Sequence, residues 1–126
     1  MIGKLGKILM IDDDEAFLSL VEVFLEEKYD LITANSVKDA LEYVNNETVP
    51  DLIILDISMP DMNGWEMFNI IKSISFLKDI PIAFLTSIDE QDEISHAHEI
   101  GAVDYIVKPC DKTNLLKRIQ DIIGKD

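Results

Sequence analysis

Residues 51–64 read Asp51-Leu52-Ile53-Ile54-Leu55-Asp56-Ile57-Ser58-Met59-Pro60-Asp61-Met62-Asn63-Gly64, and the fold follows from this stretch. Four consecutive aliphatic residues, 52–55, form a short apolar run that is typical of a strand buried on both faces. The proline, asparagine and glycine that follow favour a loop. Asp56 therefore stands at the carboxyl end of a predicted strand. In an open parallel sheet, ligands bind at this end of the strands, so Asp56 is a candidate functional residue by position alone.

Strand-like runs alternate with helical spacing along the whole chain. Besides 52–55, strands are predicted at 8–11, 31–34, 82–85 and 104–107. Helical spacing of apolar residues occurs around 17–25, 37–44, 65–74, 89–100 and 115–123. In the first helix this spacing places on the core side Phe17, Leu20, Val21, Phe24 and Leu25. The alternation predicts an α/β fold, a doubly wound five-stranded parallel sheet with five helices and right-handed crossovers.

Several residues mark where the predicted helices begin and end. Asp13 or Asp14 is expected to cap the first helix, Ser36 the second and Asp111 the last, because their side chains accept hydrogen bonds from free backbone N–H groups. Gly101 is expected to end the fourth helix in a left-handed conformation. Apolar residues in this helix are few, so we expect it to be the least firmly held.

Length and composition limit the classes of protein to which the chain can belong. The 126 residues predict one domain, 1–126 with a core of 7–123. A net charge of −14 disfavours direct binding to nucleic acid and favours cations and basic partner surfaces. Cys110 is the single cysteine, so no intrachain disulfide forms, and a reducing compartment is consistent. Residues 1–7 lack a signal-peptide core, and no stretch has the ~20 apolar residues of a membrane span. A cytoplasmic location is expected.

Chemically capable residues stand at the ends of four predicted strands: Asp12, Asp13, Asp56, Thr86 and Lys108. Two carboxylates about 4 Å apart repel by about 4 kcal/mol at an effective dielectric of about 20, so the site either raises a pKa or holds a cation. A hard cation with oxygen ligands fits, and Mg²⁺ fits best. Lys108 adds a positive charge and Thr86 a hydroxyl donor. Such a pocket suits a phosphoryl group, which a carboxylate could accept as an aspartyl phosphate.

The chain resembles the receiver domain of two-component response regulators, a flavodoxin-like fold, from Lys7 to about Ile123. Each motif is weak alone, but four of them follow in order and each ends a strand. The motifs are Met10–Asp14, Leu55–Gly64, Phe84–Ser87 and Gly101–Pro109.

This resemblance implies a role for each residue that matches a motif of the family. Asp56 is expected to be the phosphoacceptor. Asp12 and Asp13 are expected to hold Mg²⁺ together with Asp56 and the backbone carbonyl of Ser58. Lys108 would pair with the phosphoryl group. Family members receive this group from a histidine kinase or a histidine phosphotransfer protein, and they slowly hydrolyse it themselves.

The resemblance also implies a switch. Thr86 would move toward the phosphoryl oxygens and the ring of Tyr105 would turn inward. The surface of the fourth helix, fifth strand and fifth helix would then change for a downstream effector protein or domain. The switch is also compatible with a homodimer that forms through this surface on phosphorylation. The peptide bond between Lys108 and Pro109 is expected to be cis.

Three other functions compete with this interpretation. One is a receiver-fold adaptor that docks a partner without phosphorylation. Loss of an acid or of the lysine would support it, and this chain keeps them all. A phosphohydrolase of the haloacid dehalogenase type needs a second acid two residues after the nucleophile, where Ser58 stands. A dinucleotide-binding domain is disfavoured because no G-x-G-x-x-G follows the first strand.

Plainer interpretations apply to several other residues. Tyr105 could be packing alone, and Trp65 is expected in the helix core. Cys110 is given no redox role. His96 and His98 are expected on the surface, without a metal-binding role.

Overall fold

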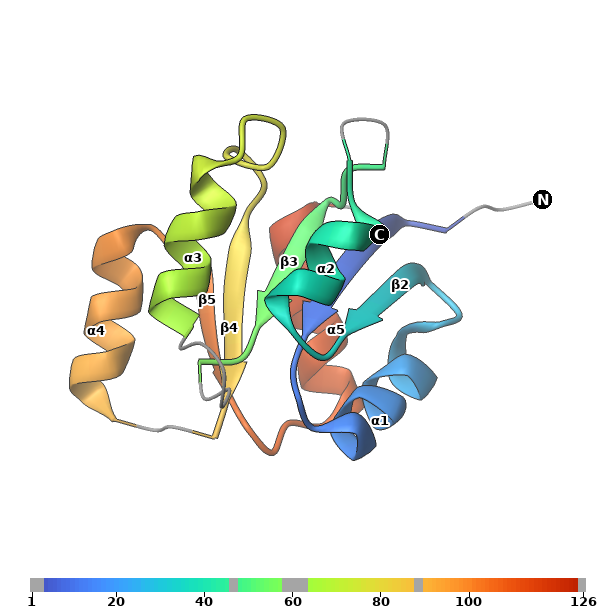
Figure 1. Ribbon diagram of the computed structural model, residues 1–126. Coiled ribbons are helices and arrows are strands. Elements are labelled where there is room, and N and C mark those ends of the chain that lie inside the picture. Colours follow the sequence, from blue (N-terminus) through green and yellow to red (C-terminus); the bar gives the residue numbers. More distant parts are fainter. Residues whose placement is uncertain (1–3, 46–47, 58–63, 88–89, 125–126) are drawn as a thin grey trace.

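The computed structural model describes residues 4–45, 48–57, 64–87 and 90–124. Helices and strands alternate strictly along the chain (Figure 1). In order they are β1 (Gly6–Ile11), α1 (Glu15–Leu25), β2 (Tyr29–Ala34), α2 (Val37–Tyr43), β3 (Leu52–Leu55), α3 (Gly64–Ser73), β4 (Ile82–Thr86), α4 (Gln91–Ile100), β5 (Asp104–Val107) and α5 (Lys112–Ile123).

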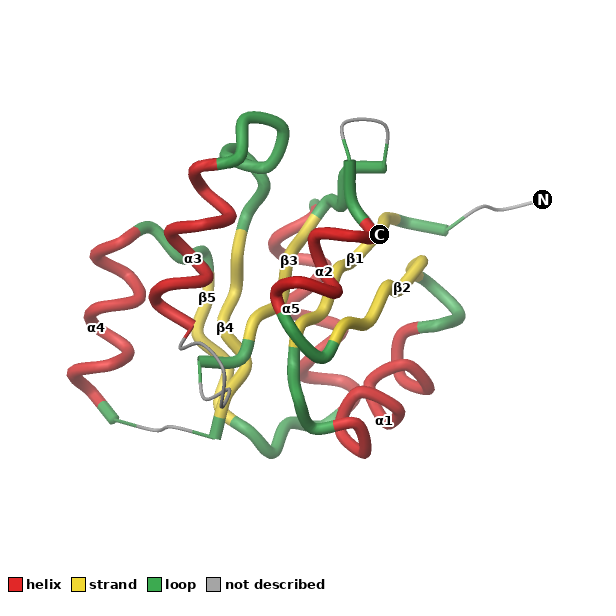
Figure 2. Tube along the Cα trace, viewed as in Figure 1, coloured by secondary structure: helices red, strands yellow, loops and turns green. Residues whose placement is uncertain are grey.

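The strands form one sheet in the order β2-β1-β3-β4-β5, and every pair is parallel. Figure 2 shows this single yellow layer between red helices. The predicted doubly wound sheet is confirmed. In the pairing of β1 with β3, Ile11 lies opposite Leu55. The residues that follow these two, Asp12 and Asp56, therefore leave the sheet side by side.

Two apolar clusters hold the helices against opposite faces of the sheet. The first joins buried residues of the strands to α2, α3 and α4. The second joins the other face of the strands to α1 and α5. The strand β3 is buried along its whole length because it is covered on both sides. This explains why residues 52–55 are uniformly aliphatic.

The boundaries and one helix face differ from the sequence-based expectation. Strand β2 begins at Tyr29 rather than at residue 31, and β4 includes Thr86. Leu20 was expected to face the core but is 46% exposed, whereas Leu18 is buried. The two faces share Val21 and Leu25, so spacing alone left the rotation of α1 ambiguous by part of a turn.

The helix ends follow the predicted capping chemistry. The side chain of Asp14 accepts a hydrogen bond from the Phe17 backbone N–H, which decides between Asp13 and Asp14. Ser36 caps α2 and Asp111 caps α5 in the same way. Gly101 follows α4 with φ of 102°, the left-handed conformation that was expected. The Lys108–Pro109 peptide bond is cis. Across the described part of the chain, the helices are too short or too polar to cross a bilayer.

Gly64, the first residue of α3, packs closely against the backbone at Asp56 and Ile57. Its backbone N–H donates a hydrogen bond to the carbonyl of Ile57, with an N–O distance of 2.9 Å. A Cβ atom on Gly64 would lie 2.6 Å from the Ile57 Cα and 3.2 Å from the Asp56 carbonyl oxygen. Both neighbours are backbone atoms, so no rotamer change could relieve the contact.

We expect Gly64→Ala to lower the free energy of unfolding by about 1–3 kcal/mol, the usual cost of forcing atoms into a packed site. Urea unfolding of the purified protein measures the loss. Gly6→Ala is the matched control, because its Cβ would meet the end of the Asp51 side chain at 3.1 Å rather than backbone. Equal stability of Gly64→Ala and wild type would contradict the close approach.

Candidate functional site

The site is built where backbone hydrogen bonds continue the sheet one residue beyond the strands. The Asp56 N–H donates to the Ile11 carbonyl, with an N–O distance of 3.0 Å. Likewise, the Lys108 N–H donates to the Thr86 carbonyl at 2.8 Å. These bonds hold the main chain of Asp56 and Lys108 in place, so both side chains project from fixed points at the carboxyl end of the sheet.

Three carboxylates meet at this edge. Oxygen atoms of Asp12, Asp13 and Asp56 all lie within 4.8 Å of one another. Asp12 and Asp56 are buried and Asp13 is exposed. The backbone N–H of Asp14 donates to Asp12 Oδ1 at 3.0 Å, which orients that carboxylate. A cluster of hard oxygen donors, partly open to solvent, matches what Mg²⁺ requires of a protein.

Lys108 places a positive charge between two of these acids. Its Nζ lies 2.6 Å from Asp12 Oδ2 and 3.4 Å from Asp56 Oδ2, and its side chain is 14% exposed. Loss of the lysine would leave two buried carboxylates without a cation, whereas loss of one acid leaves Lys108 paired with the other. The structure therefore brings together four of the predicted site residues, which come from β1, β3 and β5 or the loops that follow them.

The pKa values reflect the competition between burial and charge. Burial is the largest influence on Asp12 and raises the pKa of its carboxyl to about 6. The negative charge of Asp56 acts in the same direction, whereas the hydrogen bonds from Lys108 and the Asp14 backbone oppose it. Burial alone would lower the pKa of the Lys108 ammonium, but the two carboxylates outweigh burial and the pKa rises.

Thr86 and Tyr105 lie on the neighbouring strands β4 and β5. Thr86 is fully buried at the carboxyl end of β4. Tyr105 is 7% exposed, and its ring centroid lies 6.3 Å from that of Phe84. The tyrosine ring therefore packs inward in this structure. Ser58, expected as a backbone ligand, lies outside the described residues.

Phe17 is a part of the site that the sequence analysis missed. It lies on the core side of α1, as predicted, and packs against the second cluster. Its ring also faces the ammonium group of Lys108, with 4.3 Å between Nζ and the ring centroid. The two residues are 91 positions apart, so no local pattern could have indicated the contact. The apolar spacing of α1 identified Phe17 as a core-side residue but did not indicate which residue its ring would contact.

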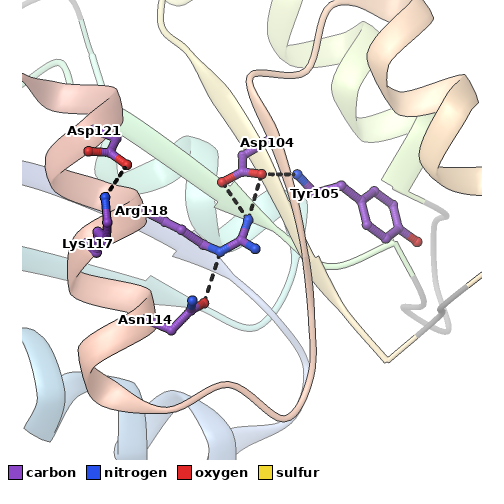
Figure 3. Close-up of polar contacts among 6 residues, drawn as sticks. All are labelled: Asp104, Tyr105, Asn114, Lys117, Arg118 and Asp121. Carbon is purple, nitrogen blue, oxygen red and sulfur yellow. Dashed lines mark hydrogen bonds and ion pairs between the residues drawn. The ribbon is translucent and has the colours of Figure 1, made fainter.

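At the amino end of β5, away from Lys108, an ion pair joins α5 to β5 (Figure 3). Arg118 Nη1 lies 2.8 Å and 2.9 Å from the two carboxylate oxygens of Asp104. The same carboxylate accepts the backbone N–H of Tyr105 at 2.8 Å, and Asn114 accepts a bond from Arg118 Nε. The outer pair of Lys117 and Asp121 is exposed and contributes little. This network was also not predicted from the sequence.

The family model of the response regulator receiver domain matches residues 8–120. The chain belongs to this family. The resemblance carried by the strand-end motifs is thereby confirmed, and the protein is a receiver domain of a two-component response regulator.

Relatives and solved structures agree on the family. The receiver domain is 35% identical over 120 residues to the alkaline phosphatase synthesis transcriptional regulatory protein PhoP of Bacillus subtilis, covering 94% of this chain and 49% of that one. It is 34% identical to the transcriptional regulatory protein CrdR of Helicobacter pylori, covering 95% and 56%. The chain thus spans about half the length of these curated relatives.

Among solved structures, the chemotaxis protein CheY4 of Vibrio cholerae has a TM-score of 0.85 at 30% identity and covers 93% of this chain and 98% of that one. The non-phosphorylated receiver domain of HemR from Leptospira biflexa has a TM-score of 0.82 at 30% identity, with 95% of each chain covered. These neighbours confirm the receiver type of the flavodoxin-like fold.

The raised pKa of Asp12 predicts how stability depends on pH. The folded receiver domain keeps the Asp12 proton to a higher pH than the unfolded chain, so ionisation of Asp12 lowers stability as the pH rises from about 4 to about 6. In Asp12→Asn this cost is absent. Without divalent cations at pH 7.5, we expect the variant to exceed wild type by about 1–2 kcal/mol in urea unfolding.

The difference should shrink toward pH 4 and on addition of Mg²⁺. Asp14→Asn is the matched control, because this side chain is exposed and asparagine caps a helix as well as aspartate does. A variant less stable than wild type at pH 7.5 would mean that the ion pair with Lys108 outweighs the burial of Asp12.

Proposed function

We propose that this chain is a single phosphoacceptor receiver domain, 1–126 with a core of 7–123, which takes up a phosphoryl group on Asp56. The observation that carries the proposal is the contact of Lys108 with both Asp12 and Asp56 at the carboxyl edge of the sheet. A fixed ammonium beside a buried carboxylate can accept a dianionic group that the carboxylates alone would repel.

The proposed reaction is a displacement at phosphorus. A carboxylate oxygen of Asp56 forms the new P–O bond while the bond to the donor breaks, and the donor leaves with that electron pair. Lys108 Nζ, 3.4 Å from Asp56 Oδ2, is placed to pair with an oxygen of the transferred group. The hydroxyl of Thr86, at the end of the adjacent strand, is the proposed neutral donor to a second oxygen.

We infer that Asp12, Asp13 and Asp56 hold Mg²⁺, because their oxygens already lie within 4.8 Å of one another. The carbonyl of Ser58 is the proposed backbone ligand. When bound, the ion would offset the carboxylate charges and draw electron density from the phosphoryl oxygens. Hydrolysis is the proposed return step: water attacks phosphorus, inorganic phosphate leaves, and the Asp56 carboxylate is restored.

The proposed switch acts on α4. Every residue of this helix is described, and Ala97 is its one buried side chain. Ring contacts lead to the helix from β4: Phe84 lies 5.0 Å from Trp65, and Trp65 lies 4.5 Å from His96, centroid to centroid. A shift of Thr86 therefore has a packed route to a weakly anchored helix. The ion pair of Asp104 with Arg118 holds the α5 side of the same surface.

The proposed partners follow from this chemistry. A histidine kinase or histidine phosphotransfer protein would supply the phosphoryl group. An effector, in the same polypeptide or in another protein, would respond to the surface of α4, β5 and α5, and a phosphorylation-dependent homodimer through this surface is a further proposal. With a net charge of −14, we expect no direct binding of nucleic acid by this chain. The cytoplasmic location stays a prediction.

Intact mass spectrometry tests the phosphoacceptor directly. After incubation with Mg²⁺ and a small phosphoryl donor, we expect the mass to rise by one phosphoryl group. Asp56→Asn and a chelator should each abolish the gain. Asp121→Asn, on the exposed outer side of α5, should leave it unchanged. Folded wild type that gains no mass would favour a phosphorylation-independent adaptor.

Hydrogen exchange tests the switch. On phosphorylation, we expect the amides of α4 to change their exchange rates by about tenfold or more, and those of α5 by much less, because α4 has the smaller buried anchor. Thr86→Ala should still take up the phosphoryl group but lose most of the response in α4. Thr113→Ala, an exposed threonine of α5, is the control. A uniform response across both helices would contradict the proposed switch.

A further inference from the structure

The ammonium group of Lys108 contacts three side chains that come from distant parts of the chain. Two are the carboxylates of Asp12 and Asp56, at 2.6 Å and 3.4 Å from Nζ. The third is the ring of Phe17, whose centroid lies 4.3 Å from the same atom. A cation at this distance from an aromatic ring is attracted by the negative face of the ring.

Phe17 is held in place by contacts with its own helix and with the core. Its backbone N–H donates to Asp14 Oδ1 at 3.1 Å, which ties it to the cap of α1. Its side chain is half-buried and packs against the core cluster that α1 shares with α5. The ring therefore approaches Lys108 from a fixed first turn of helix, whereas the lysine reaches the site on a four-carbon stem with many rotamers.

We propose that Phe17 is a positioning residue for phosphoryl uptake: its ring holds the Lys108 ammonium against Asp12 and Asp56. The proposal rests on the function proposed above and adds to it a residue that acts through Lys108. Without the ring, the ammonium keeps its contacts with the two carboxylates. The Lys108 side chain then has more rotamers available, and water has freer access to the ammonium.

An aromatic ring serves this purpose better than an aliphatic side chain of similar size. Leucine would fill much of the same volume and would also exclude water, but it has no quadrupole to attract the ammonium. The electrostatic part of the contact is therefore separable from packing. Fluorine atoms on the ring withdraw electron density from its face while its shape stays nearly constant, so a fluorinated series isolates the attraction to the cation.

The first test measures the rate of phosphorylation by a small donor in Mg²⁺. Phe17 is replaced by 4-fluoro-, 3,5-difluoro- and pentafluorophenylalanine, and separately by Leu, Tyr and Trp. We expect the rate to fall stepwise with fluorination, to be about two- to thirty-fold lower in Phe17→Leu, and to be largely kept in Phe17→Tyr and Phe17→Trp. Phe24→Leu is the matched control, because Phe24 is half-buried on the same helix and in the same cluster.

The second test observes the contact without any phosphorylation. In the NMR spectrum of protein labelled with ¹³C-lysine, the ring current of Phe17 should shift the ε-methylene protons of Lys108 away from those of the other lysines. The shift should disappear in Phe17→Leu and persist in Phe24→Leu. Thermal unfolding of each variant shows that it is folded before either measurement is interpreted.

The outcomes separate this inference from the function on which it rests. If wild type gains no phosphoryl group, the proposed function fails, and the positioning role fails with it. If wild type is phosphorylated but the rate is flat across the fluorinated series, the inference about Phe17 alone is overturned. An unshifted Lys108 signal in wild type would also overturn it, because the contact would then be absent in solution.

Discussion

The receiver domain depends on one ammonium group that lies between two buried carboxylates. Lys108 directly follows the edge strand β5, and Asp12 and Asp56 directly follow β1 and β3, so the ion pairs join the carboxyl ends of these strands across β4. Without this cation, burial and mutual repulsion would favour protonation of at least one acid. The same arrangement is poised for chemistry, since the cation that offsets the carboxylates can also pair with an incoming anion.

Much of the site could be predicted because a parallel sheet brings strand ends together. Reading where each apolar run stops was sufficient to identify Asp12, Asp56 and Lys108, whatever the helices do between them. The rotation of each helix about its own axis was harder to predict. In α1 the core-facing side was predicted to include Leu20, but Leu18 takes that place, because two overlapping faces have nearly the same apolar spacing.

Contacts between helix and strand residues lay beyond sequence reasoning for a different reason. The ring of Phe17 meets Lys108, and Arg118 meets Asp104, only because α1 and α5 cover the same face of the sheet. Their distance depends on how each helix is rotated and how far it slides along the strands. No pattern in a single sequence encodes that placement, whereas the strand-end residues are fixed by hydrogen-bond register alone.

The strand order leaves β2 and β5 as the two edges of the sheet. An open edge offers unpaired backbone groups on which a second molecule could add a strand. Here β5 is only four residues long and begins with Asp104, and β2 exposes Asp30. A neighbouring molecule that approached β2 would have to desolvate Asp30, and at either edge it would have to overcome the repulsion between two chains of charge −14. The acidic surface thus protects the sheet against edge-to-edge aggregation at high protein concentration.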